Sequence, residues 1–398
     1  MKIVYVTEFF SEKMGYSENC LPKAMALLGQ EVHVIASNLQ VYGNTPKYEE
    51  TYGRYLGPRV QPCGTMSLDG YTLHRLPHRL QSGYVGICGL ISKIGMLKPD
   101  IVQTHNCISS NALKIAIAQR ILGYKLFTEC HQHMSVTKPY LHDKTFSHPK
   151  RLLYFASRTF PGRFVSLFTE KCFPVASDCA EVARRFYGVR ERKIRIVPLG
   201  TDTDVFQPVG NEIERQERFN LRQSLGFSES EIVCIYTGRF SQEKNPLILA
   251  QAVSTLKEQG LHYGAIFIGD GEQKSEIESC KGCIVIPFVQ YIDLPMYYRA
   301  SDIAIWPTQE SMSMLDAASC GIPLVVSNRV GDLERVVGSG ATYREGDVGA
   351  LAEVLRSLYD EKLRRELGIR GREKMVEKYS WIRIAKDLLE EYKSRQVL

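Results

Sequence analysis

The segment PTQESMSMLDAASCGIP, residues 307–323, carries two acids that could serve chemistry, Glu310 and Asp316. An acid that follows a strand and precedes a helix can accept hydrogen bonds from ligand hydroxyls at the helix amino terminus. Ser313 and Asp316 also fit the S-x-x-D capping box of a helix that ends near Cys320. The pattern therefore gives Asp316 a structural explanation and leaves Glu310 without one, and capping and ligand binding are compatible.

A second segment, TGRFSQEKNP, places Gly238, Arg239 and Lys244 directly after an apolar run. Two cations at the carboxyl end of a strand, beside the start of a helix, can receive an anion with guanidinium, ammonium and backbone amides together. This spacing indicates a phosphate site. The alternative is a solvated basic loop.

Three weaker signals follow other apolar runs: the loop FIGDGEQ around Asp270, the loop MGY at Gly15, and the segment CHQH with His131 and His133. Glycine lets a backbone approach a ligand closely, but it also makes ordinary turns. A histidine at a strand end can donate to a substrate hydroxyl or transfer a proton. A hydrogen-bonded histidine without a role is the alternative, and it would be favoured if this were the only clue.

Two patterns have metal-like spacing, the pair Asp202 and Asp204 and the pair Cys280 and Cys283. The acids follow a strand at a domain junction, where Asp commonly makes turns and caps. The cysteines lack a second pair to complete a zinc site. We therefore predict no metal and no cofactor.

The elements that must position these residues alternate strand and helix along the chain. Apolar runs predict first-half strands, and a break in this rhythm at about 38–72 predicts a long loop or insertion. After residue 205 the pattern restarts. The predicted strands are 2–7, 31–37, 100–105, 125–132, 172–177 and 193–200 in the first half, and 231–239, 264–271, 283–289, 302–308 and 323–328 in the second.

This order predicts an α/β protein of two doubly wound, Rossmann-like domains with ligands at the carboxyl ends of the strands. The first domain covers 1–205 and is joined by a C-terminal amphipathic helix at 380–398, and the second covers 206–379. The cleft between the two domains is the expected site.

Composition is that of a folded protein, with 44% apolar and 24% charged residues. Because the net charge of +6 is not gathered into a basic stripe, nucleic acid is excluded as a partner. Eleven cysteines fit reduced thiols, and no apolar run is long enough to cross a bilayer, which predicts a cytoplasmic protein. The basic and apolar segment 148–164 suggests a peripheral contact with the inner face of the membrane, against the alternative of a solvated helix face.

Taken together, the second half resembles the family 4 glycosyltransferases of the GT-B fold. The resemblance is carried, in the family's order, by YTGRFSQEKNPLILAQAV, FIGDGEQ, VIPFV, LPMYYRASDIAIWPT, ESMSMLDAASCGIPLVVSN and YREGDVGALAEVL. The first half fits through MKIVYVTEFF, the Gly15 loop, GQEVHVIAS, PDIVQTH and IRIVPLGTDTDVFQP.

The resemblance implies transfer of a sugar from a nucleotide diphosphate donor with retention of configuration. Arg239 and Lys244 would then hold the diphosphate, which the Gly15 loop would also reach. Asp316 would bind the ribose hydroxyls, and His131 would contact the sugar.

The same resemblance gives Glu310 the role of orienting the donor sugar. The amides that follow it, at Ser311, Met312 and Ser313, would approach sugar or phosphate, and Gly238 and Asp270 would belong to the donor site.

One departure concerns the two acids. The family usually has a longer spacing with Glu at both positions, whereas five residues separate Glu310 from Asp316 here. Either a shortened loop lets Glu310 fill the first position, which we favour, or that acid is absent.

The expected function is therefore a hexosyl-type glycosyltransferase in polysaccharide or glycolipid synthesis. Its donor would be a nucleotide diphosphate sugar, with UDP favoured over GDP, and its acceptor a saccharide or a lipid-linked saccharide. The alternatives are a sugar-nucleotide epimerase of the same fold and a nucleotide-sugar-binding protein without transfer activity.

Overall fold

The structure is a computed structural model that describes residues 1–12, 14–81, 84–137, 152, 154–308 and 311–394. The chain divides into two compact units. Unit 1 comprises Met1–Leu199 and Ile384–Leu398, and unit 2 comprises Gly200–Arg383. The division falls between residues 199 and 200, where the sequence pattern suggested 205, and the C-terminal residues group with unit 1.

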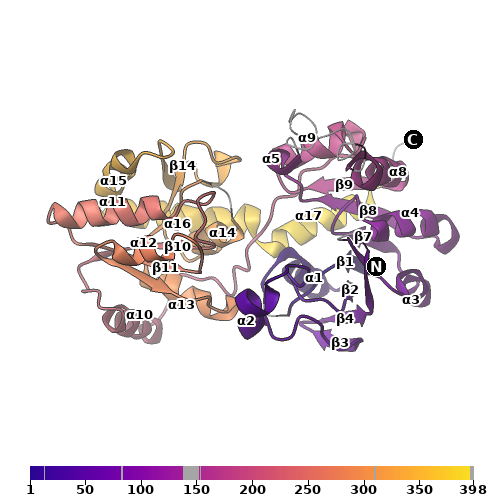
Figure 1. The fold of residues 1–398 in the computed structure, drawn as a ribbon, viewed down its shortest axis with the longest axis horizontal. Helices are drawn as coiled ribbons and strands as arrows, with labels where there is room; N and C mark the ends of the chain where they lie inside the picture. The colour runs from indigo at the N-terminus through magenta and orange to yellow at the C-terminus, as the bar shows by residue number, and fades with distance from the viewer. Residues whose placement is uncertain (13, 82–83, 138–151, 153, 309–310, 395–398) are drawn as a thin grey trace. The chain divides into compact units, whose positions relative to one another are not determined.

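Unit 1 contains a seven-stranded sheet in the order β3-β4-β2-β1-β7-β8-β9 (Figure 1). Every pair is parallel except β3 with β4. A separate antiparallel pair joins β5 and β6. The strands are β1 (Lys2–Thr7), β2 (Glu31–Ser37), β3 (Gly64–Leu68), β4 (Tyr71–Leu76), β5 (His78–Gln81), β6 (Tyr84–Ile87), β7 (Ile101–Thr104), β8 (Lys125–Cys130) and β9 (Lys171–Pro174).

The helices of unit 1 follow its strands, as parallel pairing requires. They are α1 (Ser17–Leu27), α2 (Arg54–Leu56), α3 (Leu90–Leu97), α4 (Ser110–Leu122), α5 (Met134–Thr137), α8 (Phe160–Phe168) and α9 (Ser177–Arg185). Helix α4 shows local causes at both ends: the Ser109 hydroxyl accepts from the Ala112 amide, and Gly123 ends the helix at φ 79°.

Unit 2 contains a six-stranded parallel sheet in the order β12-β11-β10-β13-β14-β15 (Figure 1). Residues Ile232 to Thr237 of β10 are buried without exception, as expected for a strand covered on both faces. The strands are β10 (Ile232–Thr237), β11 (Tyr263–Ile268), β12 (Cys283–Ile286), β13 (Ile303–Trp306), β14 (Leu324–Ser327) and β15 (Gly340–Tyr343).

The helices of unit 2 pack around this sheet, with α11 against both β11 and α15. They are α10 (Glu212–Ser224), α11 (Leu247–Glu258), α12 (Lys274–Ser279), α13 (Leu294–Ala300), α14 (Met312–Ser319), α15 (Val348–Ser357) and α16 (Glu361–Lys374). Helix α17 (Trp381–Lys393) begins in unit 2 and ends in unit 1.

The fold class is confirmed, one predicted strand is wrong, and of the two readings of 38–72 the plain loop is wrong. The stretch 38–72 is more than a loop, since it contains β3 and the start of β4. Strand β3 is almost wholly exposed, so it has no apolar face for a pattern to reveal. The predicted strand 193–200 forms only a single bridge, between Ile194 and Cys172.

Candidate functional site

The donor-site residues of the sequence analysis lie in unit 2, at one edge of its sheet. Strand β10 pairs with β11 on one side and with β13 on the other. Because all three strands are parallel, the loops that follow them gather at their carboxyl ends. These loops carry Arg239 and Lys244, Asp270, and the start of α14.

The loop after β10 presents two cations. Arg239 is exposed and Lys244 is partly buried. Across the part of the chain that the structure describes, neither side-chain cation has a hydrogen-bond or ion-pair partner. Burial and the neighbouring charge of Arg239 lower the pKa of Lys244, while Glu243 opposes them. Two positive charges at one strand end, neither of them in an ion pair within the described residues, favour an anionic ligand.

The glycines of this edge have a structural task. Gly238 has φ 147°, and a Cβ built on Gly269 would lie 2.0 Å from the Gly238 carbonyl oxygen. The Phe240 amide donates to the Asp270 carbonyl at 2.9 Å, and the Asp270 carboxylate accepts from the Gly271 amide. The loops after β10 and β11 therefore touch backbone to backbone.

Helix α14 begins two residues earlier than the capping prediction places it. Its N-cap is Ser311, while Met312 and Ser313 are its first two residues. The hydroxyls of Ser311 and Ser313 lie 2.8 Å apart, and Asp316 bonds elsewhere. The predicted Ser313 and Asp316 capping box is therefore wrong. The other predicted acid, Glu310, lies outside the described residues.

Asp316 is a buried acid, 4% exposed. Its Oδ1 accepts a hydrogen bond from the Thr201 hydroxyl at 2.7 Å. Burial raises the pKa of Asp316 to about 8, and the charge of Asp202 adds to the effect, whereas the bond from Thr201 lowers it. An acid in this state can be a neutral donor or an anionic acceptor near neutral pH.

His131 lies in unit 1, directly after β8, and belongs to a cluster of three side chains. Its Nε2 is 2.7 Å from Oε2 of Glu129, and the Nδ1 of His105 is 3.4 Å from the same oxygen. The two imidazole rings stack with their centroids 4.1 Å apart. The sequence analysis found His131 and missed the other two, although His105 also follows a strand end, that of β7.

The charges of this cluster divide unequally. Burial lowers the pKa of His105, but the hydrogen bond to Glu129 and the charges of Glu18, Glu129 and Glu8 raise it to about 9. Burial and the charge of His105 lower the pKa of His131, although Glu129 opposes this. His131 is therefore the neutral imidazole beside a His105 imidazolium at neutral pH.

A relay of buried hydrogen bonds holds Glu129 from behind. The amide of Gln103 donates to Glu129 Oε1 at 2.5 Å and accepts from the Tyr392 hydroxyl at 2.5 Å. The Tyr5 hydroxyl lies 3.2 Å from that of Tyr392. The relay fixes one carboxylate oxygen and leaves the other facing both histidines.

The same three side chains are spaced like metal ligands. The donor atoms of His105, Glu129 and His131 lie within 4.8 Å of one another. Hydrogen bonds among them account for this arrangement equally well. In the described chain the only other set with such spacing is His133, Asp178 and Cys179.

The remaining sequence signals take structural positions. Gly15, at φ 22°, lies in the loop between β1 and α1. Oδ1 of Asp202 accepts from the amides of Asp204 and Val205, which makes it a turn residue. Cys280 and Cys283 are free thiols.

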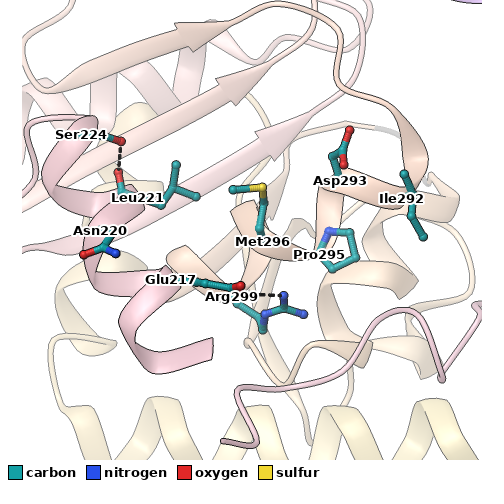
Figure 2. Close-up of a pocket in the computed structure, with 9 residues that line it drawn as sticks. All are labelled: Glu217, Asn220, Leu221, Ser224, Ile292, Asp293, Pro295, Met296 and Arg299. Carbon is teal, nitrogen blue, oxygen red and sulfur yellow. Dashed lines mark hydrogen bonds and ion pairs between the residues drawn. The ribbon is translucent and has the colours of Figure 1, made fainter. Parts of the chain in front are cut away.

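A pocket in unit 2 lies between α10 and α13 (Figure 2). Its volume is about 530 Å³, and Arg299 approaches Glu217 at 3.9 Å on its wall. None of the predicted donor-site residues lines it. Its lining residues are Glu217, Asn220, Leu221, Ser224, Ile292, Asp293, Pro295, Met296 and Arg299.

Among the described residues, no helix is both long enough and apolar enough to cross a bilayer.

Comparison of the sequence with protein families gives two matches. Residues 217–374 match the family model described as glycosyl transferases group 1, and residues 21–205 match glycosyltransferase family 4. A sulfoquinovosyl transferase of Arabidopsis thaliana is 26% identical over 369 residues, which are 89% of this chain and 65% of that protein. The chain thus spans just under two thirds of this relative.

A second relative is the UDP-Gal:alpha-D-GlcNAc-diphosphoundecaprenol alpha-1,3-galactosyltransferase of Escherichia coli. It is 26% identical over 316 residues, which are 74% of this chain and 76% of the relative.

Solved structures share the whole fold. Sucrose-phosphate synthase from Thermosynechococcus elongatus aligns with a TM-score of 0.71 at 16% identity, covering 99% of this chain and 98% of that one. HepE from Anabaena, in complex with UDP, aligns with a TM-score of 0.68 at 16% identity, covering 98% and 99%. With both halves of the sequence matched and this fold, the chain belongs to the family 4 glycosyltransferases of the GT-B fold.

Proposed function

We propose that the protein transfers a hexose-type sugar from a nucleoside diphosphate sugar to a saccharide or lipid-linked saccharide, with retention of configuration. The observation that carries the proposal is the pair Arg239 and Lys244. These two cations lie at a strand's carboxyl end, and in the described part of the chain no acid forms an ion pair with either side chain.

The donor would bind to unit 2. Arg239 and Lys244 would hold the diphosphate and stabilise the charge that develops as it leaves. Asp316 would meet the ribose hydroxyls, and the amides of Ser311, Met312 and Ser313 would approach phosphate or sugar. UDP is the favoured diphosphate, because the E. coli relative is named for UDP-Gal and HepE was solved with UDP.

The acceptor would bind to unit 1. In the same unit, the neutral imidazole of His131 would contact the sugar. In the reaction the bond between the anomeric carbon and the diphosphate oxygen breaks, and the diphosphate takes the electron pair. The acceptor oxygen forms the new bond on the same face of the sugar and gives up its proton to the departing diphosphate oxygen. A lipid-linked acceptor is supported by the name of the E. coli relative, which includes a diphosphoundecaprenol.

The test begins with thermal stability in the presence of UDP, GDP, ADP, dTDP and CMP. A ligand at a hundred times its dissociation constant stabilises the folded state by about 2.7 kcal/mol. We expect a selective rise with UDP. Labelled UDP-glucose and UDP-galactose would then be followed into saccharide and lipid fractions.

Two variants make this test specific to the phosphate assignment. Charge-assisted hydrogen bonds contribute about 1.5–3 kcal/mol each, so Arg239→Ala or Lys244→Ala should weaken UDP binding about 10- to 100-fold. Lys281→Ala is the matched control, because the Lys281 side chain is 71% exposed and, among the described residues, its ion pair is with the exposed Glu258. UDP binding that survives both site variants would refute the phosphate assignment.

The products separate the remaining alternatives. A sugar-nucleotide epimerase would convert the donor without forming an acceptor-linked product. A binding protein without transfer activity would bind UDP and leave the labelled sugar on the donor.

A further inference from the structure

Unit 1 holds a cavity of about 170 Å³ at the carboxyl ends of three neighbouring strands. Glu8 follows β1, Asn106 follows β7, and Gln132 follows β8. The other polar residues of the wall are Tyr84 of β6, Arg158, Asn44 and Ser109. Gln132 directly follows His131, so one residue of the cavity wall is next to a residue of the histidine cluster in the sequence.

The acid of this cavity is held firmly in place. Oε2 of Glu8 accepts from Nδ2 of Asn106 at 2.8 Å, and Oε1 accepts from Nδ2 of Asn111 at 3.2 Å. Oδ1 of Asn106 in turn accepts from the Ser109 amide at 2.9 Å. Each carboxylate oxygen keeps a further lone pair, which can accept from a ligand hydroxyl.

The cation of this cavity is anchored at one end only. The Nε of Arg158 donates to the Tyr84 hydroxyl at 3.2 Å, and its guanidinium lies 5.8 Å from the Tyr84 ring and 5.6 Å from the Tyr154 ring. Within the described residues, neither terminal nitrogen of Arg158 has a partner. The same holds for Nε2 of Gln132, whose Oε1 accepts from Tyr187.

The size of the cavity limits its ligand. On the same measure one water needs about 10–15 Å³, so the cavity holds on the order of a dozen waters. That is room for one sugar ring carrying one small group, and too little for a saccharide chain. The unused donors favour an anion, and the fork of an arginine fits two phosphate oxygens at once.

We propose that this cavity binds the acceptor by a sugar phosphate. Arg158 and Gln132 donate to the phosphate oxygens, and Glu8 accepts from a sugar hydroxyl. This inference rests on the proposed transfer function and adds the chemical class of the acceptor. The phosphate can belong to a soluble sugar phosphate or to the headgroup of a lipid-linked one.

The test measures binding of glucose 1-phosphate, glucose and inorganic phosphate by calorimetry, with UDP present at saturation to fill the donor site. We expect glucose 1-phosphate to bind more tightly than glucose. Arg158→Gln should weaken glucose 1-phosphate about 10- to 100-fold and leave glucose and UDP binding unchanged. Unchanged glucose binding, which uses the same cavity, also shows that unit 1 of the variant is folded.

Arg163→Gln is the matched control. Arg163 lies on the adjacent helix α8 and does not line the cavity. It should bind glucose 1-phosphate like the parent protein. If Arg158→Gln also binds like the parent, the assignment is overturned.

A lipid arm identifies the source of the phosphate. Flotation with phosphatidylglycerol vesicles that is reduced only by Arg158→Gln supports a headgroup in the cavity. If Arg158→Gln and Arg163→Gln reduce flotation equally, and the parent protein does not bind glucose 1-phosphate, vesicle binding depends on the charge of the 148–164 segment. This outcome overturns the proposal. If UDP fails to bind but glucose 1-phosphate binds through Arg158, the proposed donor fails and the cavity assignment stands.

Discussion

Ionisation of Asp316 lowers the stability of the folded state. Its carboxylate is buried, and only one of its oxygens has a hydroxyl partner in the described structure. Its pKa is about 8 in the folded protein against an ordinary value of 3.8. Between these values the folded state holds a proton that the unfolded state has lost. The free energy of unfolding therefore falls as the pH rises through this window, by up to about 1.4 kcal/mol per pH unit.

Asp316→Asn should remove this dependence, since the amide cannot ionise but can still accept from Thr201. We expect the variant to gain stability relative to the parent between pH 4.5 and 7.5. Urea titrations of both proteins at several pH values measure the difference. Parallel pH profiles would show that the carboxylate is already ionised in the folded protein.

Glu129 raises the pKa of both neighbouring histidines against the effect of burial, and the raising effect prevails at His105. Its bond raises the pKa of His105, so protonated His105 stabilises the fold below about pH 6.5, and this contribution is lost as the pH rises through about 9. Glu129→Gln removes the charge and leaves the burial, so the pKa of His105 should fall below its ordinary value. Histidine ring signals in NMR titrations measure this directly. Glu181→Gln, at an exposed ion pair on α9, should leave the signals unchanged.

Sequence patterns predict candidate site residues at strand ends better than they predict the distant residues that hydrogen-bond to them. Arg239, Lys244 and His131 could be found because each follows a recognisable strand. Thr201 could not, because it lies 115 residues from Asp316 and only the fold joins them. The capping prediction failed for the same reason: a local pattern cannot show that the carboxylate is engaged by a distant hydroxyl.

At the scale of elements, the loops after β10 and β11 touch so closely that side chains are excluded between them. Gly269→Ala would press a Cβ to 2.0 Å from a carbonyl oxygen at φ 147°, so we expect a loss of more than about 3 kcal/mol. Gly260 has φ 82° with no neighbour within 4 Å, so Gly260→Ala should cost only about 1 kcal/mol. Chemical denaturation compares the two. If both variants lost the same free energy of unfolding, the positive φ angle alone would account for the destabilisation.

The order of elements was predictable for most of the buried strands, although the mostly buried β4 was missed and the partly buried β12 was found. The prediction 302–308, for example, corresponds to β13 at Ile303–Trp306. Strand β15 escaped prediction because its residues Gly340 to Thr342 are only partly buried or exposed, so its apolar signal is weak. A strand that is largely buried consists mainly of apolar residues, and this apolar run can be recognised in the sequence.

At the scale of the whole molecule, helix α17 is what joins the chain's C-terminal residues to unit 1. Its Tyr392 is 1% exposed, packs 4.8 Å from the Phe127 ring, and donates to Gln103. Glu391 pairs with Lys171 at 2.8 Å. The helix therefore contacts strands β7, β8 and β9 through side chains.

Tyr392→Ala should destabilise unit 1 selectively, by about 3–5 kcal/mol, as for other large buried side chains. Hydrogen exchange should rise in β7, β8 and β9 and stay unchanged in β10 and β11. Lys393→Ala, at the adjacent exposed position, is the control. Uniform loss of protection in both units would show that they unfold together.

Because α17 ends in unit 1, it also determines when unit 1 can finish folding during synthesis. Residues 384–393 leave the ribosome after all of unit 2, so the sheet of unit 1 must wait, with Phe127 and Gln103 uncovered, while some 180 residues are translated. The bonds of Tyr392 to Gln103 and Tyr5 form only then. Completion of the hydrogen-bond relay behind Glu129 is thus among the last contacts that the folding chain can make.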